Sequence, residues 1–278
     1  MYKLWNNFKT TMLMAGLMGM CLGVGYLVGG RSALLPALLI GAVLNFGALF
    51  FSDRIALATM RAKEICRDDD PVLWDAVERL AERAGLPRPR VCISPATAPN
   101  AFATGRSPKH SAVCVTAGLR QMLSDRELEG VIAHELSHIK HRDILISTVA
   151  AVVAGAITWV TYLAFWFGGD DDEGSPIVAI LMMILAPIAA ALIQMAISRS
   201  REYEADRSGA EIAGNPNGLA SALSKLHSAS RRVPLPVSDA QSNMFIVAPL
   251  TGRSAAKLFM THPPVEERIS RLKAMGTT

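Results

Sequence analysis

Charged residues are scarce in this 278-residue chain, where Asp, Glu, Lys and Arg make up 19% and hydrophobic residues 51%. Together with a mean hydropathy of +0.29, this composition excludes an ordinary soluble domain. Charge is absent altogether from four apolar runs, which cover residues 12–28, 33–51, 144–167 and 177–197. Each run is close to the ~20 residues that cross a bilayer core as a helix. We therefore predict an α-rich membrane protein with four transmembrane helices in two hairpins.

Cysteine is scarce as well, and no two of the four residues form a Cys-x-x-Cys pair. Without such pairs we expect reduced, structural thiols. The cysteines are Cys21, Cys66, Cys92 and Cys114.

The first apolar run does not indicate a secretory signal peptide. No small-residue cleavage site follows this run, and a second run begins almost at once.

Basic residues lie on one side of the apolar runs. The connector within the first pair of runs holds only Arg31, and the connector within the second pair is the acidic stretch 168–174. Because Lys and Arg stay on the cytoplasmic side, we expect both termini and both long polar segments in the cytoplasm. The net charge of +4 needs no nucleic-acid partner, since anionic lipids are the natural partner of these cations. The flanking cations are Lys3, Lys9, Arg54, Arg61, Lys63, Lys140, Arg142, Arg199, Arg201 and Arg207.

The apolar runs divide the chain into five segments, and no internal repeat is visible. The two long polar segments should form one small α+β domain that is stitched to the membrane twice. The segments are a cytoplasmic N-terminus (1–9), a first hairpin (10–52), a polar part (53–143), a second hairpin (144–197) and a second polar part (198–278).

Local patterns predict the elements of the polar parts. Apolar periodicity followed by Gly85 predicts a helix over 71–86, and Ser124 with Glu127 forms a capping box that opens another helix. The loop 231–252 is either a lid or a plain surface loop. Strands are expected at 89–96 and 111–119, and further helices at 198–214, at 216–227 and after the THPP stretch at 261–264.

The helix opened by this capping box carries the sequence HELSH, residues 134–138. Histidines four residues apart project from adjacent turns, so both can reach one zinc ion, while Glu135 faces the water to be activated. The alternative is a polar helix face that carries two histidines by chance. A third histidine ligand of the HExxHxxGxxH type is excluded, because His141 and Ile144 occupy its last two defining positions. His141 itself is either a surface histidine or a group outside the ligand set.

The third ligand should come from the polar helix after the fourth apolar run, because the third and fourth runs return the chain to the HELSH helix. Glu202 and Asp206 are four residues apart on one face of that helix, and Glu204 points elsewhere. We predict that Glu202 binds the metal and that Asp206 accepts a hydrogen bond from a ligand histidine and fixes its tautomer. The alternative is solvated charge on a juxtamembrane helix.

Taken in order, PNAFATG, HELSHIKHRD, SRSREYEAD and THPP followed by an arginine resemble the HtpX-type membrane zinc endopeptidases, a group that also includes the CAAX prenyl protease. The resemblance implies a zincin-like (gluzincin) domain with one zinc ion per chain and with Glu135 as general base. It also implies that His262 and Arg268 assist the transition state. The implied zinc ligands are His134, His138 and Glu202, and the implied substrate strand holds Asn100, Ala101, Phe102, Ala103 and Thr104.

The predicted function is therefore zinc-dependent endopeptidase activity at the cytoplasmic face of a bacterial inner membrane. The resemblance implies quality control under stress, with unfolded or membrane proteins as substrates. One alternative is a CAAX-like processing protease with a dedicated substrate. Another is a non-catalytic scaffold that retains a structural zinc ion, although such a site would be closed by a fourth Cys or His, and none is apparent.

Overall fold

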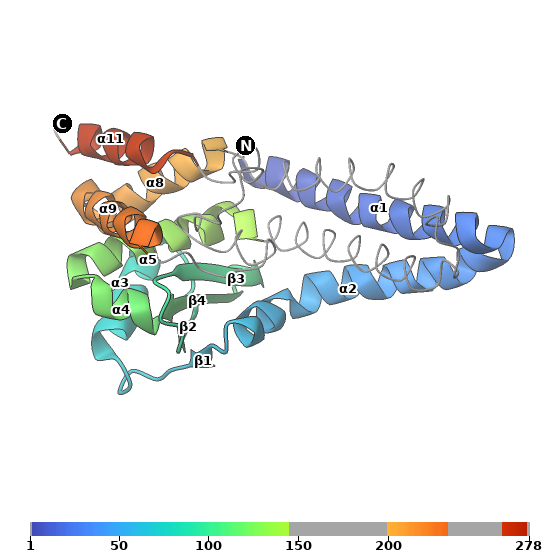
Figure 1. The fold of residues 1–278 in the computed structure, drawn as a ribbon, viewed down its shortest axis with the longest axis horizontal. Helices are drawn as coiled ribbons and strands as arrows, with labels where there is room; N and C mark the ends of the chain where they lie inside the picture. Colours follow the sequence, from blue (N-terminus) through green and yellow to red (C-terminus); the bar gives the residue numbers. More distant parts are fainter. Residues whose placement is uncertain (1, 145–198, 233–262, 277–278) are drawn as a thin grey trace. The chain divides into compact units, whose positions relative to one another are not determined.

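The computed structural model describes residues 2–144, 199–232 and 263–276 (Figure 1). These residues belong to two compact units. One contains the residues up to Ser52, and the other contains Asp53–Ile144 and the described residues from Arg199 onward. The predicted third and fourth transmembrane helices lie outside the described residues, apart from Ile144.

The first unit is a pair of long apolar helices. Two stretches of it, Asn7–Tyr26 and Gly30–Phe51, are long and apolar enough to cross a membrane, as predicted for the first hairpin. Apolar side chains are exposed along them, and Val43, for example, is 70% exposed. The unit consists of α1 (Tyr2–Gly29), the short 3-10 helix η1 (Gly30–Ala33) and α2 (Leu34–Thr59), whose last turns belong to the second unit.

Small residues set the closest approach within this helix pair. A Cβ atom on Gly25 would collide with Ala37, and one on Gly41 would lie 2.7 Å from the Met18 sulfur. Gly19 and Gly23 of α1 have nothing within 4 Å of a Cβ atom. Close packing between the two helices therefore uses Gly25 and Gly41 rather than Gly19 and Gly23.

The second unit contains a four-stranded sheet in the order β1-β2-β4-β3. β2 pairs with β4 in parallel, and the other two pairs are antiparallel. The predicted strands at 89–96 and 111–119 correspond to β2 and β4, but β4 ends at Thr116, whose side chain caps a short helix that the sequence patterns missed. The strands are β1 (Lys63–Glu64), β2 (Arg90–Ser94), β3 (Ala101–Ser107) and β4 (His110–Thr116).

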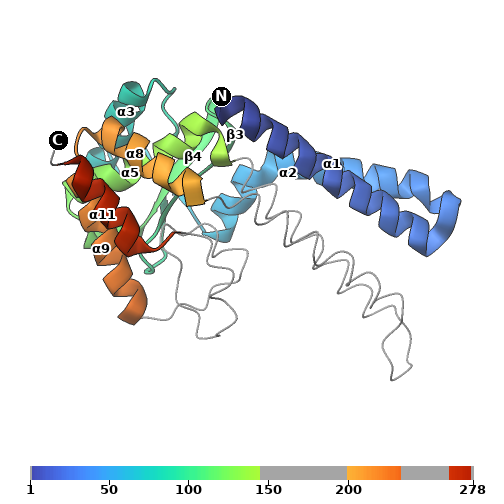
Figure 2. The same cartoon turned by 90° about the horizontal axis from the view of Figure 1, so that it is seen from above.

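Helices pack on this sheet and on one another, with α5 in the centre (Figures 1 and 2). α3 ends as predicted, because Gly85 takes the left-handed conformation (φ 69°) that closes its last turn. α9 continues to Arg232, so the first two residues of the predicted loop at 231–252 are helical, and the other residues of that stretch lie outside the described residues. The helices are α3 (Pro71–Ala84), α4 (Ala117–Met122), α5 (Asp125–His141), α8 (Arg199–Ala213), α9 (Pro216–Arg232) and α11 (Val265–Met275).

Glycines let α5 approach its neighbours closely. A Cβ atom on Gly209 of α8 would lie 2.9 Å from the backbone nitrogen of His134, and one on Gly130 of α5 would collide with the backbone of Leu219 in α9. Ser137 adds a hydrogen bond across the first interface, donating to the carbonyl of Ala205 at 3.2 Å. The helix that carries HELSH is thus held at backbone contact between α8 and α9.

Candidate metal centre

The N-terminus of α5 is fixed by the predicted capping box. The Glu127 carboxylate accepts from the backbone N–H of Ser124 at 2.8 Å, and it also binds Ser221 and Lys225 of α9. Burial alone would raise the pKa of Glu127, but the hydrogen bonds from Lys225, Ser221 and Ser124 outweigh it and lower that pKa to about 2. The carboxylate is therefore charged at neutral pH and joins the start of α5 to α9.

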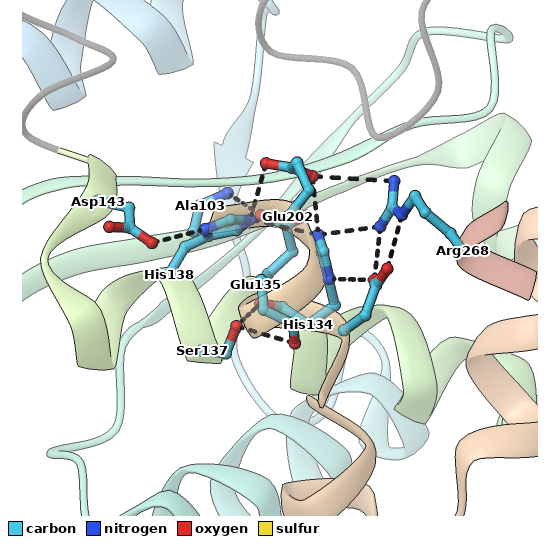
Figure 3. A network of polar contacts seen from close by, with 10 residues as sticks. Ala103, His134, Glu135, Ser137, His138, Asp143, Glu202 and Arg268 are labelled. Atoms are coloured by element: carbon cyan, nitrogen blue, oxygen red, sulfur yellow. Dashed lines mark hydrogen bonds and ion pairs between the residues drawn. The ribbon is translucent and has the colours of Figure 1, made fainter. Parts of the chain in front are cut away.

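Three metal-binding side chains meet where α5 crosses α8 (Figure 3). The Nε2 atoms of His134 and His138 face each other at 3.2 Å. The two carboxylate oxygens of Glu202 lie 3.7 Å from Nε2 of His134 and 3.8 Å from Nε2 of His138. One ligand atom from each side chain can be chosen so that all lie within 4.8 Å of one another. The structure thus brings together the three residues predicted as ligands.

A zinc ion fits this donor set. Two ligands about 2.1 Å from a tetrahedral zinc ion lie about 3.4 Å apart. The two Nε2 atoms are 3.2 Å apart, and Glu202 places Oε2 3.7 Å from His134 and Oε1 3.8 Å from His138, close to that value. Two facing imidazole nitrogens cannot satisfy each other when both rings are neutral acceptors at Nε2. A divalent cation between them, with Glu202 as the third ligand, resolves that conflict.

The charge around the rings also favours a cation. Burial would lower the pKa of His138, but the hydrogen bond to Asp143 and the negative charges of Glu202 and Glu135 outweigh burial and raise it to about 9. A dication bound at His138 would be stabilised by the same negative charges and would replace the proton that they favour on the imidazole ring.

Asp206 lies behind His134, on the side away from the ligand atoms. Its Oδ1 is 3.1 Å from Nδ1 of His134, a separation at which the carboxylate orients the ring although the atoms are not aligned for a full hydrogen bond. Arg268 of α11 is fully buried and holds both oxygens of Asp206 through Nε at 2.8 Å and Nη2 at 2.7 Å. Its Nη1 also lies 3.8 Å from Glu202. Burial would raise the pKa of Asp206, but Arg268 and His134 lower it, so that Asp206 stays ionised.

Glu135 faces the edge of the sheet. Its Oε2 accepts a hydrogen bond from the backbone N–H of Ala103 in β3 at 2.8 Å (Figure 3). Burial raises the pKa of this carboxyl above the usual range, against the lowering effect of the nearby histidines. A buried carboxyl with a raised pKa beside a metal site suits a group that takes up and returns a proton.

β3 lies at the edge of the sheet as the structure describes it. The predicted substrate strand, Asn100–Thr104, corresponds to the start of β3 and the residue before it, and Ala103 is its least buried member. His141 is half-buried at the end of α5, where burial lowers its pKa. His262, the predicted transition-state donor, lies outside the described residues.

Sequence reasoning missed two contributors to the centre. The Oδ2 atom of Asp143 lies 3.2 Å from Nδ1 of His138, within hydrogen-bond distance. Gly209 lets α8 reach the backbone of His134. Asp143 stands five residues after His138, a spacing that a regular helix does not place on one face. The signal for it was the polar Arg142–Asp143 pair directly before an uncharged run.

Comparison with known proteins decides the family. A model of peptidase family M48 matches residues 68–276. The chain belongs to this family. It is 51% identical over 279 residues to a protease HtpX homolog of Pelotomaculum thermopropionicum, covering 98% of this chain and 99% of that protein. It is 54% identical over 278 residues to another from Thermodesulfovibrio yellowstonii, with the same coverage. This M48 peptidase is thus a metalloprotease of the HtpX type, as the motifs predicted.

The fold also has a counterpart among solved structures. The crystal structure of S. mikatae Ste24p superimposes with a TM-score of 0.53, covering 98% of this chain and 66% of the other. Sequence identity in that comparison is 18%, so the likeness concerns the fold. The mostly helical M48 architecture with a small sheet is thereby shared.

Proposed function

We propose that this M48 peptidase is a membrane-embedded zinc endopeptidase that hydrolyses peptide bonds at the cytoplasmic face of a bacterial inner membrane. The observation that carries the proposal is the triplet of buried His134, partly buried His138 and buried Glu202, which lies beside the Glu135 carboxyl with its raised pKa. A zinc ion bound there would supply Lewis-acid polarisation of the scissile carbonyl and increase the acidity of a water molecule.

Within this centre, Glu135 would take a proton from the attacking water and return it to the leaving amine. The N–H of Ala103 holds the carboxylate in place in the substrate-free chain. Asp206 would keep the His134 ring oriented with Nε2 toward the ligand position. Arg268 is buried on Asp206 and near Glu202, so its predicted help to the transition state would act through these carboxylates. His262 is proposed as the additional donor to the oxyanion.

Substrate would be laid along β3. An edge strand can accept a further strand through its unpaired backbone groups, which gives affinity without sequence specificity. The N–H of Ala103 points away from β4 and toward Glu135, so the outer edge of the strand faces the general base. Residues 100–104 are therefore proposed to position a stretched peptide over the metal centre.

Unfolded or misfolded membrane proteins are the proposed substrates, since backbone pairing recognises an extended chain rather than a folded one. The catalytic domain would be assembled from segments 53–143 and 198–278, both cytoplasmic, with the second hairpin at 144–197 between them. Anionic lipids would contact the basic residues that flank the apolar runs.

The decisive experiment is digestion of an unfolded casein-type substrate by the purified full-length chain in detergent. We expect cleavage with zinc present, loss of cleavage on chelation and recovery on adding zinc. Glu135→Gln provides the matched inactive chain. A wild-type chain that binds zinc but never cleaves would favour the scaffold alternative, and chelator-resistant cleavage would exclude the metal mechanism.

A further inference from the structure

The end of α5 brings a second carboxylate to the metal centre. Oδ2 of Asp143 lies 3.2 Å from Nδ1 of His138, and Asp143 is 4% exposed (Figure 3). The Nε2 atom of the same ring faces His134 at 3.2 Å. Both ring nitrogens of His138 are therefore directed, one toward the ligand position and the other toward a buried carboxylate.

Helix geometry alone does not produce this contact. Five residues along a regular helix correspond to a rotation that leaves the side chains about 140° apart. α5 instead stops at Arg142, which takes the left-handed conformation with φ 61° and ψ 32° and donates its N–H to the carbonyls of His138 and Ile139. This left-handed residue interrupts the helix, and Asp143, which follows it, reaches Nδ1 of His138. Among the described non-glycine residues, only Arg61 shares a positive φ.

The two histidines are thus held in matching ways. Asp206 stands behind Nδ1 of His134, and Asp143 stands behind Nδ1 of His138. Arg268 binds Asp206 directly through Nη2 at 2.7 Å. A histidine that binds a metal through one nitrogen is oriented by what the other nitrogen contacts.

We propose that Asp143 is a positioning residue for His138, which fixes the tautomer and orientation of the ring for metal binding through the left-handed turn at Arg142. The proposal rests on the metal centre of the proposed function and adds Asp143 to the residues that orient its ligands. Asp143 touches neither substrate nor reacting atoms in this role and acts only through the ring of His138.

The test is zinc affinity, measured on the purified full-length chain in detergent by competition with a chromophoric chelator. Asp143→Ala is expected to weaken zinc binding by about 10- to 100-fold. Asp143→Asn keeps an acceptor oxygen and should lie between this variant and the wild type. Asp68→Ala, which removes an exposed aspartate before α3, is the matched control and should bind zinc like the wild type.

A second pair of variants tests the turn without touching Asp143. Glycine adopts φ near 61° freely, whereas a β-branched residue is strained there. Because the Arg142 side chain is exposed, Arg142→Gly should retain zinc affinity, and Arg142→Val should lose part of it. If Asp143→Ala does not fold, the partial loss expected for Asp143→Asn and the contrast between the two Arg142 variants test the proposal in its place.

The Co²⁺-substituted protein gives a readout that a merely structural role would not change. A reoriented His138 should shift the visible absorption bands in Asp143→Ala but leave them in place in Asp68→Ala. Wild-type affinity and an unchanged cobalt spectrum in Asp143→Ala, with zinc lost in His138→Ala, would overturn the role of Asp143 alone. Zinc retained in His138→Ala would overturn the proposed metal centre itself.

Discussion

Two glutamates meet at the metal centre, and their surroundings give them different tasks. Glu135 accepts a hydrogen bond from Ala103 in the sheet, whereas both oxygens of Glu202 lie within 4 Å of the histidine Nε2 atoms. Burial raises the pKa of the Glu135 carboxyl above its usual range, which suits a group that takes up a proton. Substituting Glu135 and Glu202 one at a time should therefore separate the role of proton acceptor from the role of metal ligand.

Glu135→Gln should abolish cleavage and leave zinc content nearly unchanged. The amide cannot accept a proton from water, while His134, His138 and Glu202 remain in place to bind the metal. Peptidase rate and zinc stoichiometry on the same preparation check this expectation. Turnover at the wild-type rate would remove Glu135 from the mechanism.

Glu202→Ala should lose zinc and activity together, whereas Glu204→Ala should keep both. Glu204 lies on another face of α8, where it pairs with Arg207 at 2.7 Å. Asp206→Ala should fall between them, with zinc affinity reduced by about 10- to 100-fold. Zinc titration of the three variants in one detergent at one pH separates the roles. Loss of zinc in Glu204→Ala, with retention in Glu202→Ala, would mean that another register of α8 operates in solution.

At the scale of elements, the position of α5 depends on contacts at its first turn and near its middle. Glu127 joins its first turn to α9, and Gly209 of α8 contacts the backbone beside His134. Both contacts lie away from the ligand atoms, so their loss should act on the centre through helix position.

Glu127→Gln should destabilise the second unit by about 1–3 kcal/mol, because a buried charged acceptor of several hydrogen bonds is replaced by an amide that can accept fewer. The pKa of Glu127 is about 2 in the folded chain, against 4.5 ordinarily. Its contribution to stability is therefore complete above the unfolded value and disappears as the pH falls through 4.5 toward 2. Thermal melting across this range should show a steeper loss for the wild type than for Glu127→Gln. Equal slopes would exclude the linkage.

Gly209→Ala should weaken zinc binding although alanine favours helices. The gain in helix propensity is about 1 kcal/mol, but the added Cβ would lie 2.9 Å from the nitrogen and Cα of His134. α8 would have to move away from α5, at a cost of about 1–3 kcal/mol, and would carry Glu202 with it. Glu211→Ala is the matched control on the exposed face of the same helix. Zinc affinity and melting temperature compare the two, and a more stable Gly209→Ala chain with full affinity would contradict the expectation.

At the scale of the whole molecule, local patterns predicted more than long-range ones. The stop of α3 at Gly85 and the capping box at Ser124 depend on neighbouring residues and were found directly. The ligand triplet was predictable because His134 and His138 keep helical spacing, Glu202 shares a helix face with Asp206, and the third and fourth apolar runs were expected to return the chain to the HELSH helix. The parallel pairing of β2 with β4 and the contact of Asp143 with His138 were missed. The first depends on the order in which the chain passes between the strands, and the second on one left-handed residue at Arg142, and residue spacing encodes neither.

The membrane topology is the last expectation and the one that reaches over the whole chain. Basic residues flank the apolar runs on one side, and the connector at 168–174 is acidic. Since positively charged flanks remain in the cytoplasm, HELSH and the C-terminus should be cytoplasmic, and residues 170–173 should be on the outer side. Reporter fusions at Gly169 and Thr278, one reporter active only outside and one only inside, measure both positions.

An inward reporter at Thr278 and an outward one at Gly169 would match an even number of crossings with the second hairpin inserted. The catalytic parts at 53–143 and 198–278 would then lie on one side, as a site built from α5 and α8 requires. A cytoplasmic HELSH with an outward C-terminus would mean an odd number of crossings within residues 144–197. Glu202 and His134 would then be separated by the bilayer, which their 3.7 Å approach does not allow.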